Sequence, residues 1–160
     1  MYSVRTNNFR KDLSFGKKFE RMAFQYFKGY DRVVYATGKC KTHDVTFYTK
    51  GTPCRVEVKA DRWTQRTGNL AIEYNCSGKD SGILVTKADY WLHFCVNDGN
   101  KPTVYKIPIN DLKKIITEGY RTHQLRNKTK ALVYLVPQER VSEYEVRPTR
   151  ELIDDSNSTE

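Results

Sequence analysis

Apolar residues near the start of the chain recur at intervals of three and four positions. Between residues 13 and 30 they are Phe15, Phe19, Met22, Ala23, Tyr26 and Phe27. This spacing places them on one face of an α-helix, and Gly29 is a residue type that commonly follows a helix end. The pattern therefore predicts an amphipathic helix over residues 13–30.

Shorter apolar runs after this helix predict β-strands. Four of them, at residues 32–36, 45–48, 55–59 and 70–74, are separated by turns that contain glycine, which favours an antiparallel meander. Further along, the pattern predicts a helical turn at 86–90, followed by strands at 91–96 and 104–107 that a hairpin at 98–100 joins. A second helix is predicted at 108–120, and a last strand at 131–136 completes the sheet.

This order of elements predicts an α/β fold in which a central mixed β-sheet is flanked by helices. The length of 160 residues fits one domain with its own hydrophobic core, and we place that domain at residues 1–137. Residues 138–160 are rich in charge and end in DDSNSTE, so we expect a partly disordered C-terminal extension.

The net charge of +9, from 28 Lys and Arg against 19 Asp and Glu, favours a polyanionic partner, nucleic acid first among them. Ribosomal, membrane-surface and polyphosphate-binding proteins have similar totals, so charge alone does not name the partner. The four cysteines form no CxxC pair and the three histidines have no zinc-type spacing. Because no apolar leader or membrane-spanning run is present, we expect a cytoplasmic protein with reduced thiols and no membrane partner.

The chemistry-bearing positions lie in two of the predicted strands. In the run 55–59, Val56 and Val58 alternate with Glu57 and Lys59, so the acid and the lysine share one face of the sheet. Asp44 precedes the strand at 45–48, and pairing of the two strands would bring it beside Glu57. Carboxylates of this kind hold Mg²⁺, and a nearby lysine can orient or deprotonate an attacking water. The alternative is an ion pair on a solvated sheet face.

A helix that carries an acid, an Asp at a strand start and the EVK sequence of Glu57 to Lys59 together resemble the PD-(D/E)XK nuclease superfamily. The stretches RTGNLAIEY (66–74) and SGILVTKADYW (81–91) are similar to phage-encoded and Holliday-junction-resolvase-like members, and the similarity covers about residues 15–96. His43 replaces the proline of the family motif. The resemblance implies a restriction-endonuclease-like sandwich and hydrolysis of DNA that leaves a 5'-phosphate. It assigns Asp44 and Glu57 to Mg²⁺, with Mn²⁺ as a substitute, Glu20 to the metal or its water, and Lys59 to catalysis.

Further residues are candidates for supporting roles. Glu73 would join the metal cluster or hold Lys59, and Gln65 would bind water or phosphate, the alternatives being an exposed glutamate and an ordinary loop residue. A third group of side chains is suited to contacting DNA, because arginine and lysine bind phosphate and tryptophan stacks on a base: Arg62, Trp63, Arg66 and Lys87. Trp63 covering the edge of the core is the alternative.

The sequence therefore predicts a Mg²⁺-dependent endodeoxyribonuclease. A junction-resolving enzyme and a nicking, restriction or homing endonuclease stay open within this class, and a cut in both strands would need a homodimer. The competing class is a basic nucleic-acid-binding module without catalysis. Asp111-Leu112-Lys113 repeats the acid-x-lysine pattern at a predicted helix start, where Asp111 would cap free amides.

Overall fold

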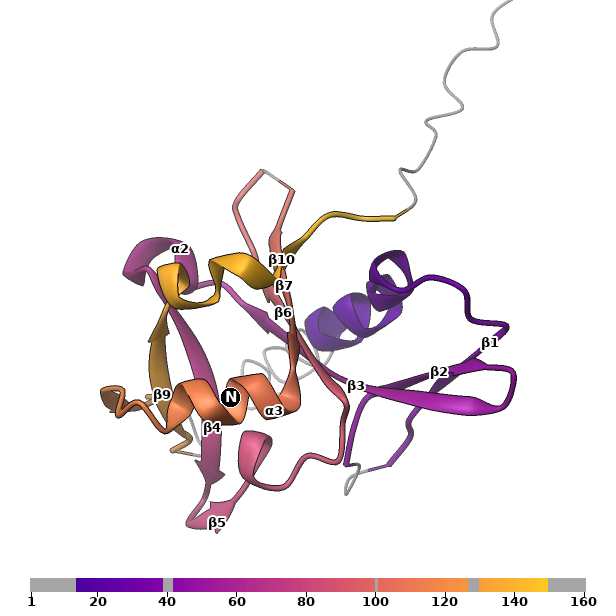
Figure 1. The fold of residues 1–160 in the computed structure, drawn as a ribbon. Coiled ribbons are helices and arrows are strands. Elements are labelled where there is room, and N and C mark those ends of the chain that lie inside the picture. The colour runs from indigo at the N-terminus through magenta and orange to yellow at the C-terminus, as the bar shows by residue number, and fades with distance from the viewer. Residues whose placement is uncertain (1–13, 39–41, 100, 127–129, 150–160) are drawn as a thin grey trace, which may run out of the picture.

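The computed structural model describes residues 14–38, 42–99, 101–126 and 130–149. It has an α/β fold with two β-sheets and a few helices (Figure 1). The predicted α/β class and the mixed character of the central sheet are confirmed. The expected start of the first helix at Leu13, the hairpin residue Asn100 and the tail 150–160 lie outside the described residues.

The first helix is shorter than the apolar pattern predicts. Residues 14–22 are α-helical and continue as the 3₁₀ helix η1 (Ala23–Tyr26). The chain becomes extended at Phe27, where φ is −128° and ψ is 143°. Phe27 still packs into the core, because its ring stacks on Phe47 with 4.6 Å between centroids. Phe27 is apolar because it packs in the core, and its spacing from the helical residues made the predicted helix longer than the real one.

The central sheet has six strands in the order β1-β2-β3-β6-β7-β10. They are β1 (Arg32–Tyr35), β2 (Val45–Thr49), β3 (Thr52–Asp61), β6 (Tyr90–Cys95), β7 (Thr103–Pro108) and β10 (Glu145–Val146). The first three strands pair antiparallel, as do β6 with β7 and β7 with β10. Between these two parts β3 pairs parallel with β6, and this pairing makes the sheet mixed.

The second sheet has four strands in the order β5-β4-β9-β8, all antiparallel. They are β4 (Asn69–Cys76), β5 (Lys79–Asp80), β8 (Thr122–Gln124) and β9 (Leu132–Pro137). The sequence placed the strands at 70–74 and 131–136 in the central sheet, and this was wrong. In an antiparallel meander β4 would pair with β3. In the structure β6 pairs with that edge of β3, and β4 pairs with β9, which is distant in the sequence.

The helical turn predicted at residues 86–90 was also wrong. The structure has a 3₁₀ helix slightly earlier, η2 (Gly82–Leu84), and the chain then runs extended beside the β2–β3 hairpin. The backbone N–H groups of Lys87 and Asp89 donate to the carbonyl oxygens of Thr42 and Arg55, at 3.0 and 2.7 Å. These long-range hydrogen bonds outweigh the local helical preference.

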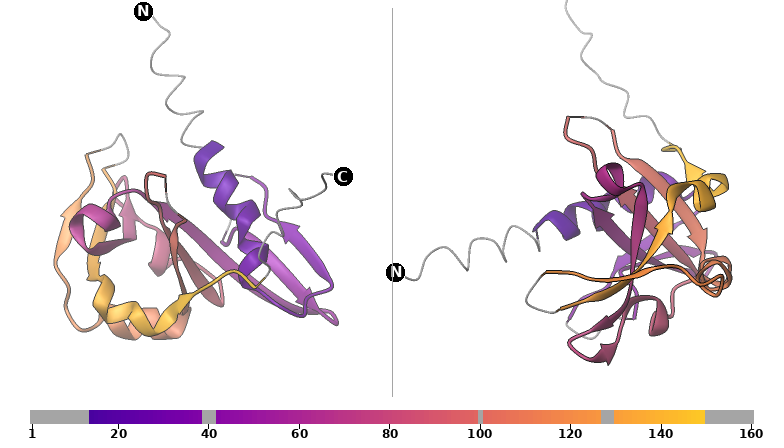
Figure 2. Two further views of the ribbon diagram at one scale, coloured as in Figure 1. Left: turned by 90° about the horizontal axis from the view of Figure 1, so that it is seen from above. Right: turned by 90° about the vertical axis from the view of Figure 1, so that its left-hand side faces the viewer.

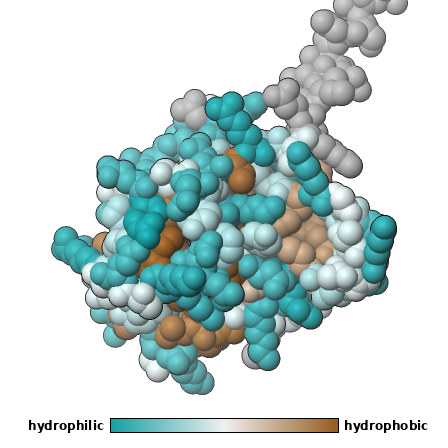
Figure 3. Space-filling model, in the orientation of Figure 1, coloured by the Kyte–Doolittle hydropathy of each residue, from teal (hydrophilic) through white to brown (hydrophobic). Residues whose placement is uncertain are grey.

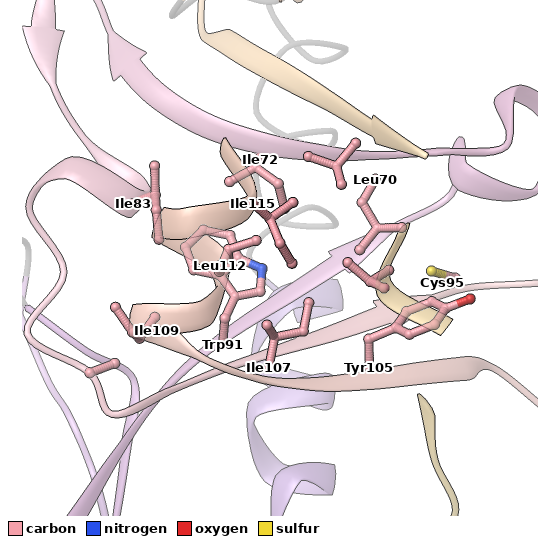
Figure 4. Packing of buried hydrophobic residues seen from close by; sticks show 13 residues of the cluster. Leu70, Ile72, Ile83, Trp91, Cys95, Tyr105, Ile107, Ile109, Leu112 and Ile115 are labelled. Atoms are coloured by element: carbon pink, nitrogen blue, oxygen red, sulfur yellow. The ribbon is translucent and has the colours of Figure 1, made fainter. Parts of the chain in front are cut away.

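The two faces of the central sheet form separate hydrophobic cores because successive side chains of β6 point in opposite directions. Leu92 and Phe94 pack with Val56, Val58 and the first helix. Trp91 and Cys95 face the other way, toward β4, β9 and the helix α3 (Ile109–Ile116). Figure 2 shows the first helix and the second sheet on opposite sides of the central sheet, and Figure 4 shows Trp91 among side chains of β4 and α3.

The C-terminal described segment belongs to this fold. The 3₁₀ helix η3 (Gln138–Tyr144) buries Val141 completely in the core that contains Trp91. The following strand β10 pairs with β7 at the edge of the central sheet. The boundary that the sequence placed after Pro137 is therefore not a break in the structure, and the fold continues at least to Val146.

Hydrophilic residues cover most of the face shown in Figure 3, and hydrophobic residues form separate patches on it. No helix in residues 14–38, 42–99, 101–126 and 130–149 has the length and apolar character to cross a membrane.

Replacing Val141 by alanine tests the place of η3 in the core. Loss of two buried methyl groups should lower the free energy of unfolding by about 1–3 kcal/mol, measured by urea denaturation. Val34→Ala is the matched control, since Val34 on β1 is 41% exposed and its loss should have little effect. Equal stability of the two variants would show that η3 does not contribute to the fold.

Candidate active site

The site forms at the start of β2, where β3 continues beyond its pairing with β2. Val45, the first residue of β2, pairs with Val56, so Asp44 lies next to Glu57. The N–H of Asp44 donates to the carbonyl of Val56 at 2.9 Å. Its carboxylate accepts a hydrogen bond from the N–H of Val58 at 2.8 Å. Asp44 thereby satisfies backbone groups of β3 at the point where β2 no longer pairs with it. Its side chain is buried.

Glu57 and Lys59 lie on the face of β3 that is turned away from Val56 and Val58. In the parallel register they stand beside Trp91 and His93 of β6. The Lys59 Nζ lies 3.3 Å from the Glu57 carboxylate, and the exposed fractions of the two side chains are 34% and 13%. Because Glu57 is largely buried, the ion pair on a solvated sheet face, which was the alternative from the sequence, does not describe this pair.

Glu73 reaches the same region from the second sheet. Its carboxylate accepts a hydrogen bond from the hydroxyl of Ser81 at 2.8 Å. The pairing of β4 with β9 is irregular between Glu73 and Asn75, and irregular pairing of this kind re-aims side chains. Gly82 lies so close behind Glu73 that a Cβ on it would collide with the Glu73 carbonyl oxygen. Although β4 is not a neighbour of β3 in either sheet, Glu73 shares a pocket with Glu57 and acts electrostatically on Lys59.

A pocket of about 520 Å³ joins these groups. Glu20 lines it from the helix at 14–22, Asp44 from the start of β2, Glu57 and Lys59 from β3, and Glu73 from β4. Phe15 and Gly16 form part of the wall on the helix side, and Ser81, Gly82, Val85 and Thr86 form part of it on the other side. Four carboxylates and one lysine, far apart in the sequence, thus share one opening.

The charge of Lys59 depends on these carboxylates. Partial burial alone would lower its pKa, but Glu57, Glu73 and Asp44 outweigh burial and raise the pKa above the ordinary value. Lys59 is therefore protonated at neutral pH. In this state it can donate hydrogen bonds and stabilise negative charge, whereas it cannot accept a proton from water.

The donor set suits a hard divalent cation in kind, since Mg²⁺ prefers carboxylate oxygens. The charge also fits, because three carboxylates act on the one ammonium group of Lys59. Among the residues that the structure describes, no three Asp, Glu, His or Cys side chains lie close enough to hold a metal together. Because Lys59 already lies 3.3 Å from the Glu57 carboxylate, a cation bound to Glu57 would compete with Lys59 for it.

The remaining sequence candidates lie outside the pocket lining. Gln65 is exposed in the short helix α2 (Thr64–Thr67), and Lys87 is exposed beside pocket residue Thr86. Arg62 stacks on the ring of Phe15 with 3.9 Å between its guanidinium carbon and the ring centre. Trp63 is 61% exposed, so it does not cover the edge of the core.

A buried network behind α2 was missed from the sequence. The indole N–H of Trp91 donates to Nδ1 of His93 at 3.2 Å, and Nε2 of His93 lies 3.0 Å from the Asp61 carboxylate. Since an indole N–H can only donate, the proton of this imidazole is on Nε2 and points at Asp61. Asp61 also accepts hydrogen bonds from Thr64. Asp61 and Thr64 are spaced as in a capped turn, but nothing local in the sequence indicated His93.

Comparison of the chain with protein families, with curated proteins and with solved structures found no match.

The contact between Gly82 and Glu73 predicts a specific sensitivity to a methyl group. Gly82→Ala should lower the free energy of unfolding by about 1–3 kcal/mol more than Gly78→Ala, because it adds an overpacked contact to the strain of a positive φ. Gly78 is the matched control, with a φ of 80° and nothing within 4 Å of an added Cβ. Similar denaturation midpoints for the two variants would contradict the close packing at Glu73.

The electrostatics of Lys59 predict a titration that depends on Glu57. Because the folded-state pKa is raised, this contribution to stability is present at neutral pH and is lost as pH rises through that pKa. In Glu57→Gln the pKa of Lys59 should fall, since burial remains while the nearest negative charge is removed. NMR titration of the Lys59 side chain measures the change. Glu139→Gln, an exposed residue of η3, should leave the titration unaltered, and an unchanged curve in Glu57→Gln would refute the assignment.

Proposed function

We propose that the protein is a divalent-metal-dependent endonuclease that hydrolyses phosphodiester bonds of DNA. The observation that carries this proposal is the shared pocket of Glu20, Asp44, Glu57, Glu73 and Lys59. A solvated surface would scatter these charges, whereas here separate elements converge on one opening. Such convergence of titratable groups is typical of catalytic sites.

In the proposed site Asp44 and Glu57 supply the carboxylate ligands of Mg²⁺ or Mn²⁺, with Glu20 supporting the ion or its water from the helix side. A bound ion would polarise the scissile phosphate and lower the pKa of a coordinated water. Glu73 helps to keep Lys59 protonated and in place. Lys59, as a cation, orients the attacking water and stabilises the charge that develops on the phosphate oxygens.

The mixed central sheet is compatible with the restriction-endonuclease-like architecture that the sequence resemblance implies. This sheet carries the first helix on one face, and it places Asp44 at the start of its second strand and Glu57 on its third. The other face is covered by a second sheet as well as by α3. This arrangement differs from a sheet flanked by helices alone.

Exposed basic residues beside the pocket and in the segment after β3 suit contacts with a DNA backbone. Arg62, Arg66 and Lys87 are exposed, and Arg62 contacts the pocket residue Phe15. With the net charge of +9, these side chains provide the phosphate contacts of the proposal. DNA affinity should accordingly fall with rising salt. The proposal keeps the cytoplasmic location expected from the sequence, and cutting of both strands would require a homodimer.

The proposal predicts that the intact protein nicks or linearises supercoiled plasmid in Mg²⁺ or Mn²⁺ and does not in EDTA. Glu57→Gln and Lys59→Ala should each slow cutting by at least about 100-fold, because one removes a metal ligand and the other removes the cation at the phosphate. Gel analysis of the plasmid over time measures the rates. DNA binding, measured by fluorescence anisotropy, should persist in both variants.

The second acid-x-lysine sequence supplies a matched control. Lys113 is exposed on α3, where Asp111 accepts a hydrogen bond from the hydroxyl of Tyr144. Lys113→Ala should cut at the rate of the unaltered protein. If the intact protein binds DNA but does not cut it with either ion, the enzyme is excluded and the basic nucleic-acid-binding module stands. If Lys113→Ala and Lys59→Ala lose activity equally, the assignment of Lys59 is wrong.

A further inference from the structure

We propose that Trp63 stacks on an unpaired base, so that the preferred substrates are DNAs with unpaired bases within a few nucleotides of the bond that is cut. This inference rests on the proposed function for the cutting step. Binding through Trp63 is argued separately, from the exposure of its side chain, the fixation of its backbone and the charges around it.

Trp63 is the most exposed large hydrophobic side chain of the residues that the structure describes, at 61%. Leaving an indole in water forgoes the stabilisation that its burial would give. A fixed, exposed tryptophan is therefore unfavourable for folding alone. Stacking on a base would cover the indole face, and every base offers a suitable surface.

The backbone that carries Trp63 is held by buried groups. The N–H groups of Trp63 and Thr64 donate to the Asp61 carboxylate at 2.7 and 2.8 Å. His93 and Thr64 are fully buried and both bond to Asp61. Burial would raise the pKa of Asp61, but the hydrogen bonds from His93 and Thr64 outweigh it and hold that pKa well below its usual range. The anchor is thus ionised at neutral pH, and the indole projects from a rigid base.

Two arginines give this projection the chemistry of a nucleic-acid contact. The guanidinium of Arg66 lies 5.5 Å from the centre of the Trp63 ring, and Arg62 stacks on Phe15, which lines the pocket. Arginine binds phosphate and also stacks beside bases. An exposed indole with arginines on both sides of it in the sequence suits single-stranded DNA better than it suits an apolar protein partner.

The position of Trp63 in the chain limits where the base must be. Four residues of chain lead from Lys59 in the pocket to Trp63, and they span at most about 14 Å when fully extended. Stacked nucleotides rise 3.4 Å per step, so this backbone span corresponds to about four nucleotides, to which the lengths of the two side chains add. In a continuous duplex the bases at this distance are paired and stacked within the helix. An unpaired base there would be free to meet the indole.

The binding test compares oligo(dT) with a blunt, fully paired two-strand duplex of equal charge, both fluorescein-labelled, by anisotropy in EDTA. Trp63→Ala should weaken oligo(dT) binding by roughly 5- to 150-fold while duplex binding stays unchanged. Trp63→Phe should restore most of the difference. Tyr48→Ala is the matched control, because Tyr48 also carries a stacked arginine, Arg32, at 4.1 Å, and it should bind both DNAs as the unaltered protein does.

Equal binding of oligo(dT) by Trp63→Ala and the unaltered protein would overturn the inference. Equal weakening for both DNAs would also overturn it, since stacking on an unpaired base predicts a difference. Loss of the folded circular dichroism spectrum in Trp63→Ala would overturn it as well, because the side chain would then be structural.

A cleavage test separates this inference from the proposed function. Duplexes of one sequence, fully paired or with a short unpaired stretch, are incubated with Mg²⁺ and the unaltered protein or Trp63→Ala. Faster cutting of the unpaired substrate that is lost in Trp63→Ala supports the inference. Cutting without any such preference refutes the inference and leaves the nuclease. Base-dependent binding through Trp63 without any cutting supports the base contact and refutes the nuclease.

Discussion

The parallel pairing of β3 with β6 is the contact on which the rest of the structure depends. It joins the antiparallel unit β1-β2-β3 to the hairpin β6-β7, and β6 lies between the two cores. Leu92 and Phe94 serve one core while Trp91 and Cys95 serve the other. The same register places Glu57 beside Trp91 and Lys59 beside His93, so the position of the acidic site follows from the pairing that builds the core.

Charge balance is the second constraint, and it concerns the pocket. Four carboxylates around one opening repel one another, and desolvation adds to that cost. Lys59 offsets part of the repulsion, and Val58 and Ser81 donate hydrogen bonds to Asp44 and Glu73. A hard cation would neutralise the remaining charge. Under the proposed function, Lys59 offsets the carboxylates when no ion is bound, and a divalent ion would take over part of this role.

The buried network of Asp61, His93 and Trp91 links the core to the exposed segment that follows β3. The indole of Trp91 packs in the core and fixes the tautomer of His93, which holds Asp61, and Asp61 in turn holds the backbone of Trp63. A chain of hydrogen bonds that begins in the core thereby fixes the backbone of an exposed residue. Trp63 follows β3 by two residues, and β3 contributes Glu57 and Lys59 to the pocket. The proposed base contact and the pocket are therefore connected through one strand.

The amino-acid sequence by itself determined the local elements and one face of the site. Helical spacing indicated the helix that contains Glu20, and alternation in β3 placed Glu57 with Lys59 opposite Val56 and Val58, because side-chain direction follows from the backbone period. The tertiary structure decided which strands pair and which side chains come together in the site. The partner of β4 is β9, some sixty residues away by their numbering, and Glu73, Glu20 and His93 take their places only through such contacts. No local pattern encodes pairing between strands so far apart in the sequence. The pairing is decided by the whole fold, which must bury both faces of β6 and satisfy the hydrogen bonds of the strand edges at the same time.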